Sequence, residues 1–290
     1  MGLGYEGYIS LQVDAIADVA LGTGGGVPES RQRLESSSGY GGRIKTPVSE
    51  MGIGLPHNYD WSSYDGSMDF DVHEDFLTNQ IIPWIFDRQK GAIVNVQTRA
   101  DNVQTFPKCY WNSINLSASE GGLLTGSIGF VGMDRSVYTR GGDYIGNKTG
   151  GNTLCAGGSP VFPTPLQLGV TIPYWNTFVD IDASLVEFTS WSLDFNQDVV
   201  KFFGCNSNTN VQEPSYVAVG PMSITFTGDY MFVGAASFLS PDTLTSLYVT
   251  MGGEQIKLED LELLTDTDVL QGQDAIVPVS IDYTAYTLVA

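Results

Sequence analysis

Histidine and cysteine are the residue types that most often bind metals or carry catalysis, and here they are few and scattered. The 290-residue chain contains two histidines, His57 and His73, and three cysteines, Cys109, Cys155 and Cys205. The histidines lack HExxH spacing, and the cysteines lack CxxC spacing and do not cluster with the histidines. The pattern therefore does not predict a zinc site. An odd number of cysteines also argues against a disulfide framework.

Three further patterns invite a chemical interpretation, and each has a simpler one. His73 and Glu74 are adjacent, but neighbouring residues of an extended segment point to opposite faces, so we predict a surface position at a helix start instead of a catalytic pair. The glycine-rich stretches 22–26 and 146–151 lack the GxxxxGK[ST] phosphate-binding motif. The acidic stretch 258–268 lacks the glycine of an EF-hand loop and is interpreted as a solvated face. The sequence predicts no enzyme, no cofactor and no metal site.

The charge of the chain is strongly negative and unevenly distributed. The formal net charge is −20, and residues 149–290 contain only two cations, Lys201 and Lys257. Charged residues make up 16% of the chain, against roughly 25% in an average soluble domain, so much of the surface is uncharged or covered by other subunits. Such a chain repels nucleic acid, because phosphate contacts need cations. The charge is explained either by colloidal solubility or by a wall past which DNA moves without adhering.

The start of the chain differs in composition from the rest. Residues 1–58 are predicted to form an N-terminal arm, because segment 22–43 is rich in glycine and serine and has little periodicity. Its three arginines, Arg31, Arg33 and Arg43, suit docking on an acidic neighbour. We expect the arm to become ordered on assembly.

The N-terminus and the apolar runs indicate where the chain is made. The first residues lack the basic and apolar regions of a secretory signal. No apolar run approaches the ~18 residues that span a membrane. We therefore expect synthesis in a cytoplasm and no membrane-spanning segment.

Residues 59–290 are predicted to form one β domain with a helix at its side. Alternating apolar and polar residues recur in long segments, and the helices that parallel βαβ units require are absent from the pattern. An antiparallel sandwich or barrel-like fold follows. Residues 136–166 lose this periodicity and predict a long loop. Segment 240–251 fits either a short helix opened by Ser240 and Pro241 or a strand.

The predicted helix follows His73. Asp75 is placed to cap its start, and Pro83 is expected to kink or break it. The apolar stripe has the spacing of an amphipathic helix and consists of Phe76, Leu77, Gln80, Ile81, Trp84 and Ile85.

Two long hairpins carry an unusual polar face. In residues 109–132 the turn is supplied by Glu120 and two glycines, and a second hairpin spans 186–227. Apolar residues alternate strictly with small polar ones, which fixes the register. A solvated face normally carries lysine and glutamate, whereas this face is formed by Ser113, Asn115, Ser117, Thr125, Ser127, Ser192, Asp194, Ser223, Thr225 and Thr227.

Taken in order, these segments resemble the bacteriophage tail tube (major tail) proteins. The resemblance covers roughly residues 60–287, and it depends on the serial order of the pieces because no single piece is specific. The arm at 1–58 has no counterpart. The matching stretches are GSMDFDV (66–72), FLTNQIIPWIF (76–86), CYWNSINLSASEGGLLTGSIGFVG (109–132), FTSWSLDFNQD (188–198), VGPMSITFTGDYMF (219–232) and AIVPVSIDYTAY (275–286).

The resemblance implies a structural protein of the virion, assembled in the host cytoplasm. Its fold would be two packed antiparallel β-sheets with a flanking helix. Six copies would form a ring whose inner strands join into one barrel, and stacked rings would form a tube through which DNA is ejected without specific binding. Partners would be further copies of the chain, other tail proteins at the tube ends and, in a tail that has one, a sheath. The ten polar residues would face the lumen.

Two alternatives fit the same residues. One is another β-rich shell or decoration protein of a virion, which would also be acidic and without a catalytic site. The other is a carbohydrate-binding β-sandwich module, against which the expected absence of a secretory signal counts.

Overall fold

The computed structural model describes residues 8–13, 31–33, 36–38, 43–49, 56–62, 64–89, 91–99, 102–132, 136–139, 145–146, 170–182, 184–202, 211–212, 216–232, 245–268 and 277–289. Most of these residues lie in strands. The strands are β1 (Tyr8–Val13), β2 (Arg31–Arg33), β3 (Ser36–Ser38), β4 (Arg43–Ser49), β5 (Pro56–Ser62), β6 (Tyr64–Asp71), β7 (Ala92–Arg99), β8 (Asn102–Ser119), β9 (Thr125–Gly132), β10 (Ser136–Thr139), β11 (Ile145–Gly146), β12 (Thr177–Ile181), β13 (Ser184–Val186), β14 (Phe188–Phe202), β15 (Val211–Gln212), β16 (Tyr216–Phe232), β17 (Ser246–Met251), β18 (Glu254–Asp268) and β19 (Val277–Val289). The helical segments are α1 (Glu74–Phe76), the π-helical turn η2 (Leu77–Ile81), α2 (Ile82–Phe86) and the 3-10 turn η5 (Tyr174–Asn176).

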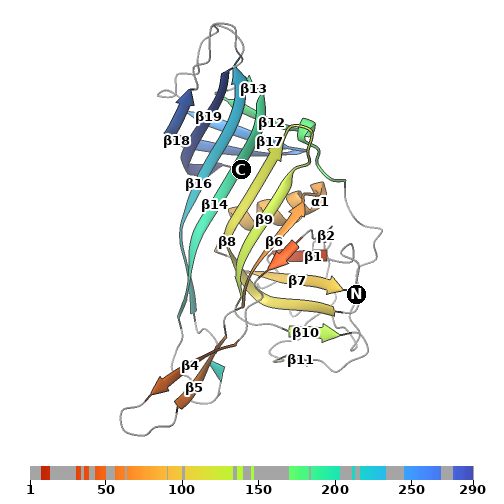
Figure 1. The fold of residues 1–290 in the computed structure, drawn as a ribbon, viewed down its shortest axis with the longest axis vertical. Coiled ribbons are helices and arrows are strands. Elements are labelled where there is room, and N and C mark those ends of the chain that lie inside the picture. Colours follow the sequence, from red (N-terminus) through yellow and green to blue (C-terminus); the bar gives the residue numbers. More distant parts are fainter. Residues whose placement is uncertain are drawn as a thin grey trace.

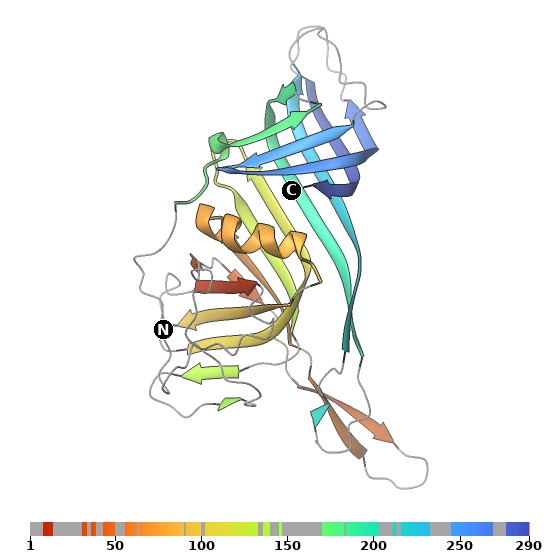
Figure 2. The same ribbon diagram turned by 180° about the vertical axis from the view of Figure 1, so that it is seen from behind.

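The protein is mainly β and antiparallel, as the alternating pattern predicts. Sixteen strands form one hydrogen-bonded sheet whose main path is β13-β12-β17-β18-β19-β16-β14-β8-β7-β1-β2. The sheet curls over at its upper end, where β12, β17 and β18 cross β14 and β16 (Figures 1 and 2). The two packed layers expected from the sequence are therefore limbs of one continuous sheet. A separate three-stranded sheet, β15-β5-β4, lies at the opposite end of the long axis (Figure 1).

The 18-residue strand β8 connects the two halves of the large sheet. Its first half pairs with β7 from Asn102 to Cys109, and its second half pairs with β9 from Cys109 to Ser117. On the edge opposite to β9, β14 pairs with residues 113–119 of β8. One strand, β8, therefore hydrogen-bonds both to the lower strand β7 and to β14, which leads into the curled upper end.

The core contains the residues that the two-residue period places inside. Met68, Phe70 and Val72 are at most 2% exposed, as the alternation of β6 predicts. On the second hairpin, Trp191, Leu193, Phe195, Ile224 and Phe226 are buried, and Met222 is partly buried against them. Each fully buried side chain of this size contributes roughly 1.5–3 kcal/mol relative to exposure.

The helix packs its predicted stripe against the sheet. All six stripe residues are buried, including the polar Gln80, and Phe76 meets Phe70 edge to face at 5.4 Å between ring centroids. The indole nitrogen of Trp111 donates a hydrogen bond to the Trp84 carbonyl at 2.8 Å, which ties the helix to β8. Asp75 does not cap the helix, because the N-cap position is His73 and it makes no side-chain capping bond.

The helix does not end at Pro83, although the sequence predicts a kink or break there. It continues to Phe86 after one π-helical turn, Leu77–Ile81, that directly precedes the proline segment. A proline has no N–H to donate and its ring clashes with the carbonyl one turn earlier. The wider π-helical turn directly before the proline segment accommodates this change in the helix.

Two of the bulges occur where a strand buries residues three positions apart, whose side chains would otherwise point to opposite faces. Trp111 and Ile114 are both buried, and the β8–β9 register shifts between Trp111 and Ser113. Phe188 and Trp191 are likewise both buried, with a shift between Phe188 and Ser190. One extra residue per strand restores the inward orientation on both sides of the bulge.

Several sequence expectations fall wholly or partly outside the described residues. In the predicted arm, 1–58, the described parts are strands: β1 pairs with β7, and β3 pairs with β6. A serine-rich segment gives little sequence signal for such pairing, because backbone groups alone make the bonds. Of the loop 136–166, only β10 and β11 are described, and the rest lies outside. In segment 240–251, Ser246–Met251 is a strand.

Candidate functional site

The ten polar residues predicted to line a channel lie together on one face of the sheet. They come from the strands β8, β9, β14 and β16, and each alternates with a core residue on its strand. Because successive side chains of a strand point to opposite faces, the burial of the core residues places the polar ones on the other side. The ten are Ser113, Asn115, Ser117, Thr125, Ser127, Ser192, Asp194, Ser223, Thr225 and Thr227, and none of them is buried.

Strand register arranges this face in rows that cross seven strands, β6-β9-β8-β14-β16-β19-β18. One row contains Asp71, Thr125, Ser117, Ser192, Thr227, Asp282 and Thr265. The next contains Asp69, Ser127, Asn115, Asp194, Thr225, Thr284 and Glu262. We call these two rows together the polar face. Eight of the ten predicted residues lie in these two rows, and the other two, Ser113 and Ser223, lie in the adjoining row on either side of Asn196. The polar face also extends beyond the predicted residues, to β6 on one side and to β19 and β18 on the other.

Side chains of the polar face bond to one another. The Asn115 amide nitrogen donates to the Asp194 carboxylate at 2.6 Å, and the Ser192 hydroxyl donates to the same carboxylate at 3.3 Å. Ser117 and Thr125 share a hydroxyl–hydroxyl bond of 2.9 Å. Cross-strand pairs of this kind stabilise a sheet, and they occupy hydroxyl and amide groups that would otherwise bind a ligand.

The polar face is acidic. Its first row carries the carboxylates of Asp71 and Asp282, its second those of Asp69, Asp194 and Glu262, and neither row carries a lysine or arginine. A surface of this composition repels phosphate groups, since binding them requires cations.

The two cations of the C-terminal half lie off the polar face and are paired. Lys201 contacts the Asp65 carboxylate at 3.0 Å, and Lys257 pairs with Glu259. Lys257 also lies over the ring of Tyr248, 5.4 Å from its centroid. Neither is therefore available to bind phosphate without giving up a carboxylate.

Candidate catalytic groups do not gather in the described part of the chain. His73 is buried, 6% exposed, so the predicted surface position is wrong; its backbone forms an isolated antiparallel β-bridge with Thr171. Cys109 is a free, fully buried thiol, and burial raises its pKa well above the ordinary value, which disfavours the reactive thiolate. Among the described residues, no group of three acidic, histidine or cysteine side chains is arranged to hold a metal ion.

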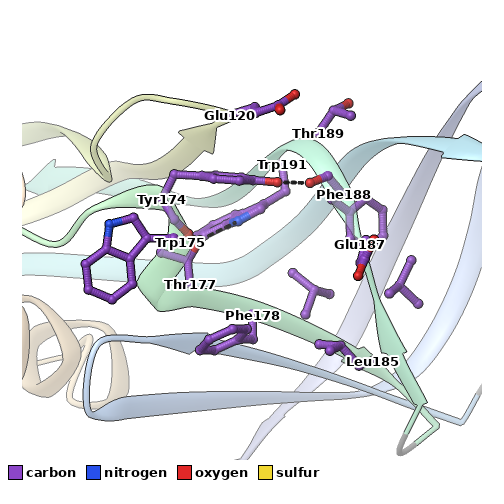
Figure 3. Close-up of a pocket in the computed structure, with 12 residues that line it drawn as sticks. Glu120, Tyr174, Trp175, Thr177, Phe178, Leu185, Glu187, Phe188, Thr189 and Trp191 are labelled. Carbon is purple, nitrogen blue, oxygen red and sulfur yellow. Dashed lines mark hydrogen bonds between the residues drawn. The ribbon is translucent and has the colours of Figure 1, made fainter.

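The sequence interpretation missed a cavity of about 460 Å³ at the upper end of the molecule. Its wall contains Tyr174 and Trp175 from η5, Phe178 from β12 and Leu185 from β13 (Figure 3). The Tyr174 hydroxyl donates a hydrogen bond to the Phe188 carbonyl. Three aromatic residues within five positions, next to a proline, are the sequence signal that marks this cavity.

Two carboxylates, Glu120 and Glu187, belong to the lining of this cavity (Figure 3). Burial raises the pKa of Tyr174, and the charges of Glu120 and Glu187 raise it further. Both carboxylates therefore disfavour ionisation of the same tyrosine hydroxyl. Glu120 is the turn residue of the first predicted hairpin, so the turn of that hairpin borders the aromatic cavity.

Comparison with known proteins gives no identification. Neither the known protein-family models nor the curated proteins include a match to this chain. In the described part of the chain, the helices are too short or too polar to cross a bilayer.

Proposed function

We propose that this protein is the subunit of a bacteriophage tail tube. Six copies form a ring, rings stack into a tube, and the polar face of each copy lines the channel through which DNA is ejected. The observation that carries the proposal is the polar face itself. It is broad, it holds five carboxylates and no cation in its two rows, and its small polar side chains bond mainly to each other. Such a wall contacts DNA without holding it.

A ring of this kind needs sheet edges that a neighbouring copy can pair with. In the described residues, β16 pairs with β19 only from Ile224 onward, and its first part, Tyr216–Ser223, pairs with β14 alone. The lower part of β14 and β16 thus extends as a two-stranded ribbon below the point where β8 turns away (Figure 2). Phe202 and Tyr216 at its end are 51% and 65% exposed, which suits a surface that a neighbour covers.

The proposal includes the surroundings of a tail tube. The protein would be found in the virion after assembly in the host cytoplasm. It would contact other tail proteins at the two ends of the tube and a sheath where the tail contracts, and DNA would pass without specific binding.

Electron microscopy of the purified full-length protein tests the proposal. Negative staining is expected to show rings or tubes of uniform diameter. A protein that remains monomeric at high concentration, in sedimentation velocity as well as in micrographs, would refute it. Closed shells or a coat on other particles would favour a virion shell or decoration protein.

A carbohydrate-binding module is the second candidate, because one observation favours it. Trp175 is 74% exposed beside the aromatic cavity, and exposed aromatic rings bind sugars by stacking. Titration with oligosaccharides, followed by tryptophan fluorescence, distinguishes the two functions: saturable binding that is lost in Trp175→Ala supports the module.

A further inference from the structure

The upper end of the molecule carries an unusual group of exposed apolar side chains around the aromatic cavity. Trp175, Phe178 and Leu185 are 74%, 44% and 59% exposed, and all three line the cavity. Leu185 lies on β13, the terminal strand of the sheet path, which has an edge open to further pairing in the described structure. Apolar groups gathered at a cavity and a sheet edge mark a site of protein contact.

The electrostatics of the cavity select the kind of group that fits. Glu120 and Glu187 are both exposed members of the lining, and the lining contains no lysine or arginine. Aromatic faces attract cations, and the aliphatic stems of lysine and arginine cover apolar surface. The cavity therefore suits a lysine or arginine side chain, with its stem against the rings and its charge near the carboxylates.

The chain itself contains a segment that fits this description. Strand β4, Arg43–Ser49, has the sequence RIKTPVS, with two cations and no acid. It pairs with β5 in a small sheet that lies at the end of the long axis opposite to the cavity (Figures 1 and 2). A copy cannot fill its own cavity with this segment, but a neighbour placed along the long axis can.

We infer that the cavity formed by Tyr174, Trp175, Phe178 and Leu185 receives the basic strand β4, Arg43–Ser49, of a second copy. A contact between opposite ends of identical subunits is heterologous, and repeating it gives a stack that does not close on itself. The inference rests on the proposed tube, in which each ring presents one end of its subunits to the other end of the next ring. It assigns Glu120 to the contact between rings instead of to the channel.

Photo-crosslinking in the full-length protein tests this inference. The photoreactive residue p-benzoylphenylalanine replaces Trp175, isotopically labelled and unlabelled copies are mixed and assembled, and cross-linked peptides are identified by mass spectrometry. We expect links from position 175 to residues 43–62 that join a labelled copy to an unlabelled one. The same probe at Ser223, an exposed residue of β16, serves as the control and is expected not to reach that segment.

A charge-reversal variant makes the cross-linking test quantitative. Glu187→Arg in the probe-bearing copies is expected to lower the cross-linked fraction about tenfold, which corresponds to about 1.4 kcal/mol of lost contact energy. Asp198→Arg, an equal charge change on an exposed residue outside the cavity, is expected to leave the fraction unchanged. Equal effects of the two reversals would overturn the assignment of the cavity.

The outcomes separate this inference from the proposed function. Tubes in which position 175 cross-links only within one copy, or to the ribbon end near Phe202 and Tyr216, would overturn the inference and leave the tube proposal standing. Links to residues 43–62 in particles that are not tubes would support the contact and count against the tube. Failure of both assembly and cross-linking would overturn both.

Discussion

Among the glycines of the described residues, Gly228 of β16 is a position at which a single added methyl group should disturb the fold sharply. A Cβ at this position would lie 2.5 Å from Cδ1 of Phe188, closer still to Cε1 of the same ring, and 3.0 Å from the Phe226 ring. Phe188 is 4% exposed. Its ring contacts Phe226 and Tyr230 edge to face, with centroids 5.5 and 5.7 Å away. The ring therefore cannot swing aside without disturbing two other aromatic contacts.

We expect Gly228→Ala to lower the free energy of unfolding by about 2 kcal/mol, within the range of about 1–3 kcal/mol for inserting a methyl group into a packed core. For a domain of this size, each kcal/mol corresponds to roughly 2–4 °C in Tm, so the melting midpoint should fall by about 4–8 °C. Urea unfolding followed by tryptophan fluorescence measures the free energy, and calorimetry measures Tm.

The matched control is Gly253→Ala in the turn between β17 and β18. A Cβ there meets no atom within 4 Å, and the backbone is not in the left-handed region, so the change should lie within about 0.5 kcal/mol of zero. A Gly228→Ala protein as stable as this control would refute the reasoning, because it would mean that the Phe188 ring does not lie against the backbone of β16.

Three further predictions concern single side chains. The Asp182 carboxylate accepts bonds from the Thr245 and Ser246 amides at 3.0 and 2.9 Å; burial opposes its ionisation, but these bonds outweigh burial and hold the pKa below the ordinary 3.8. Asp182→Asn, whose side chain tolerates the left-handed φ of 46° at this position, should therefore cost about 0.5 kcal/mol at neutral pH, because Asp182 is exposed and solvent weakens bonds to its charge. The cost should disappear as the pH falls through the folded pKa in acid unfolding curves. A cost that persists at pH 2 would contradict this prediction. In a variant that keeps only Cys109, the buried thiol should react with Ellman's reagent no faster than the protein unfolds, and immediate labelling would show that the site is open. Thr225→Lys adds a cation to the polar face, so assembled particles should retain DNA in filter binding at low salt and release it at high salt; equally tight retention by the unchanged protein would count against the proposed channel.

The sequence predicts those parts of the fold that depend on residue periodicity. Ile114, Leu116 and Ala118 are buried, and the residues between them form part of the polar face. The apolar stripe of the helix is equally well predicted, because both periods follow directly from backbone geometry. The turn after β8 is confirmed by Gly121, whose φ of 75° is one that glycine adopts without strain.

Features that depend on contacts between distant segments were not predictable in the same way. The aromatic cluster at residues 174–178 is visible in the sequence, but the cavity forms only when Tyr174 and Leu185 come beside Phe188, and no local pattern indicates that meeting. The sequence indicates only a solvated face for the acidic stretch 258–268, but Leu258 is fully buried and the stretch is part of β18, from which the Glu262 carboxylate joins the polar face. Its alternation was present in the sequence, and the density of charge obscured it.

The single long strand β8 has a mechanical consequence. Its two halves hydrogen-bond to different parts of the sheet, so neither part can open without breaking bonds to the same strand. Slow amide hydrogen exchange should therefore be shared by both halves, as in one cooperative unit. Because β8, β14 and β16 run at a steep angle along the long axis (Figure 1), a pull between the two ends of the molecule loads many ladder bonds together in shear. That arrangement resists extension far better than peeling bonds one at a time.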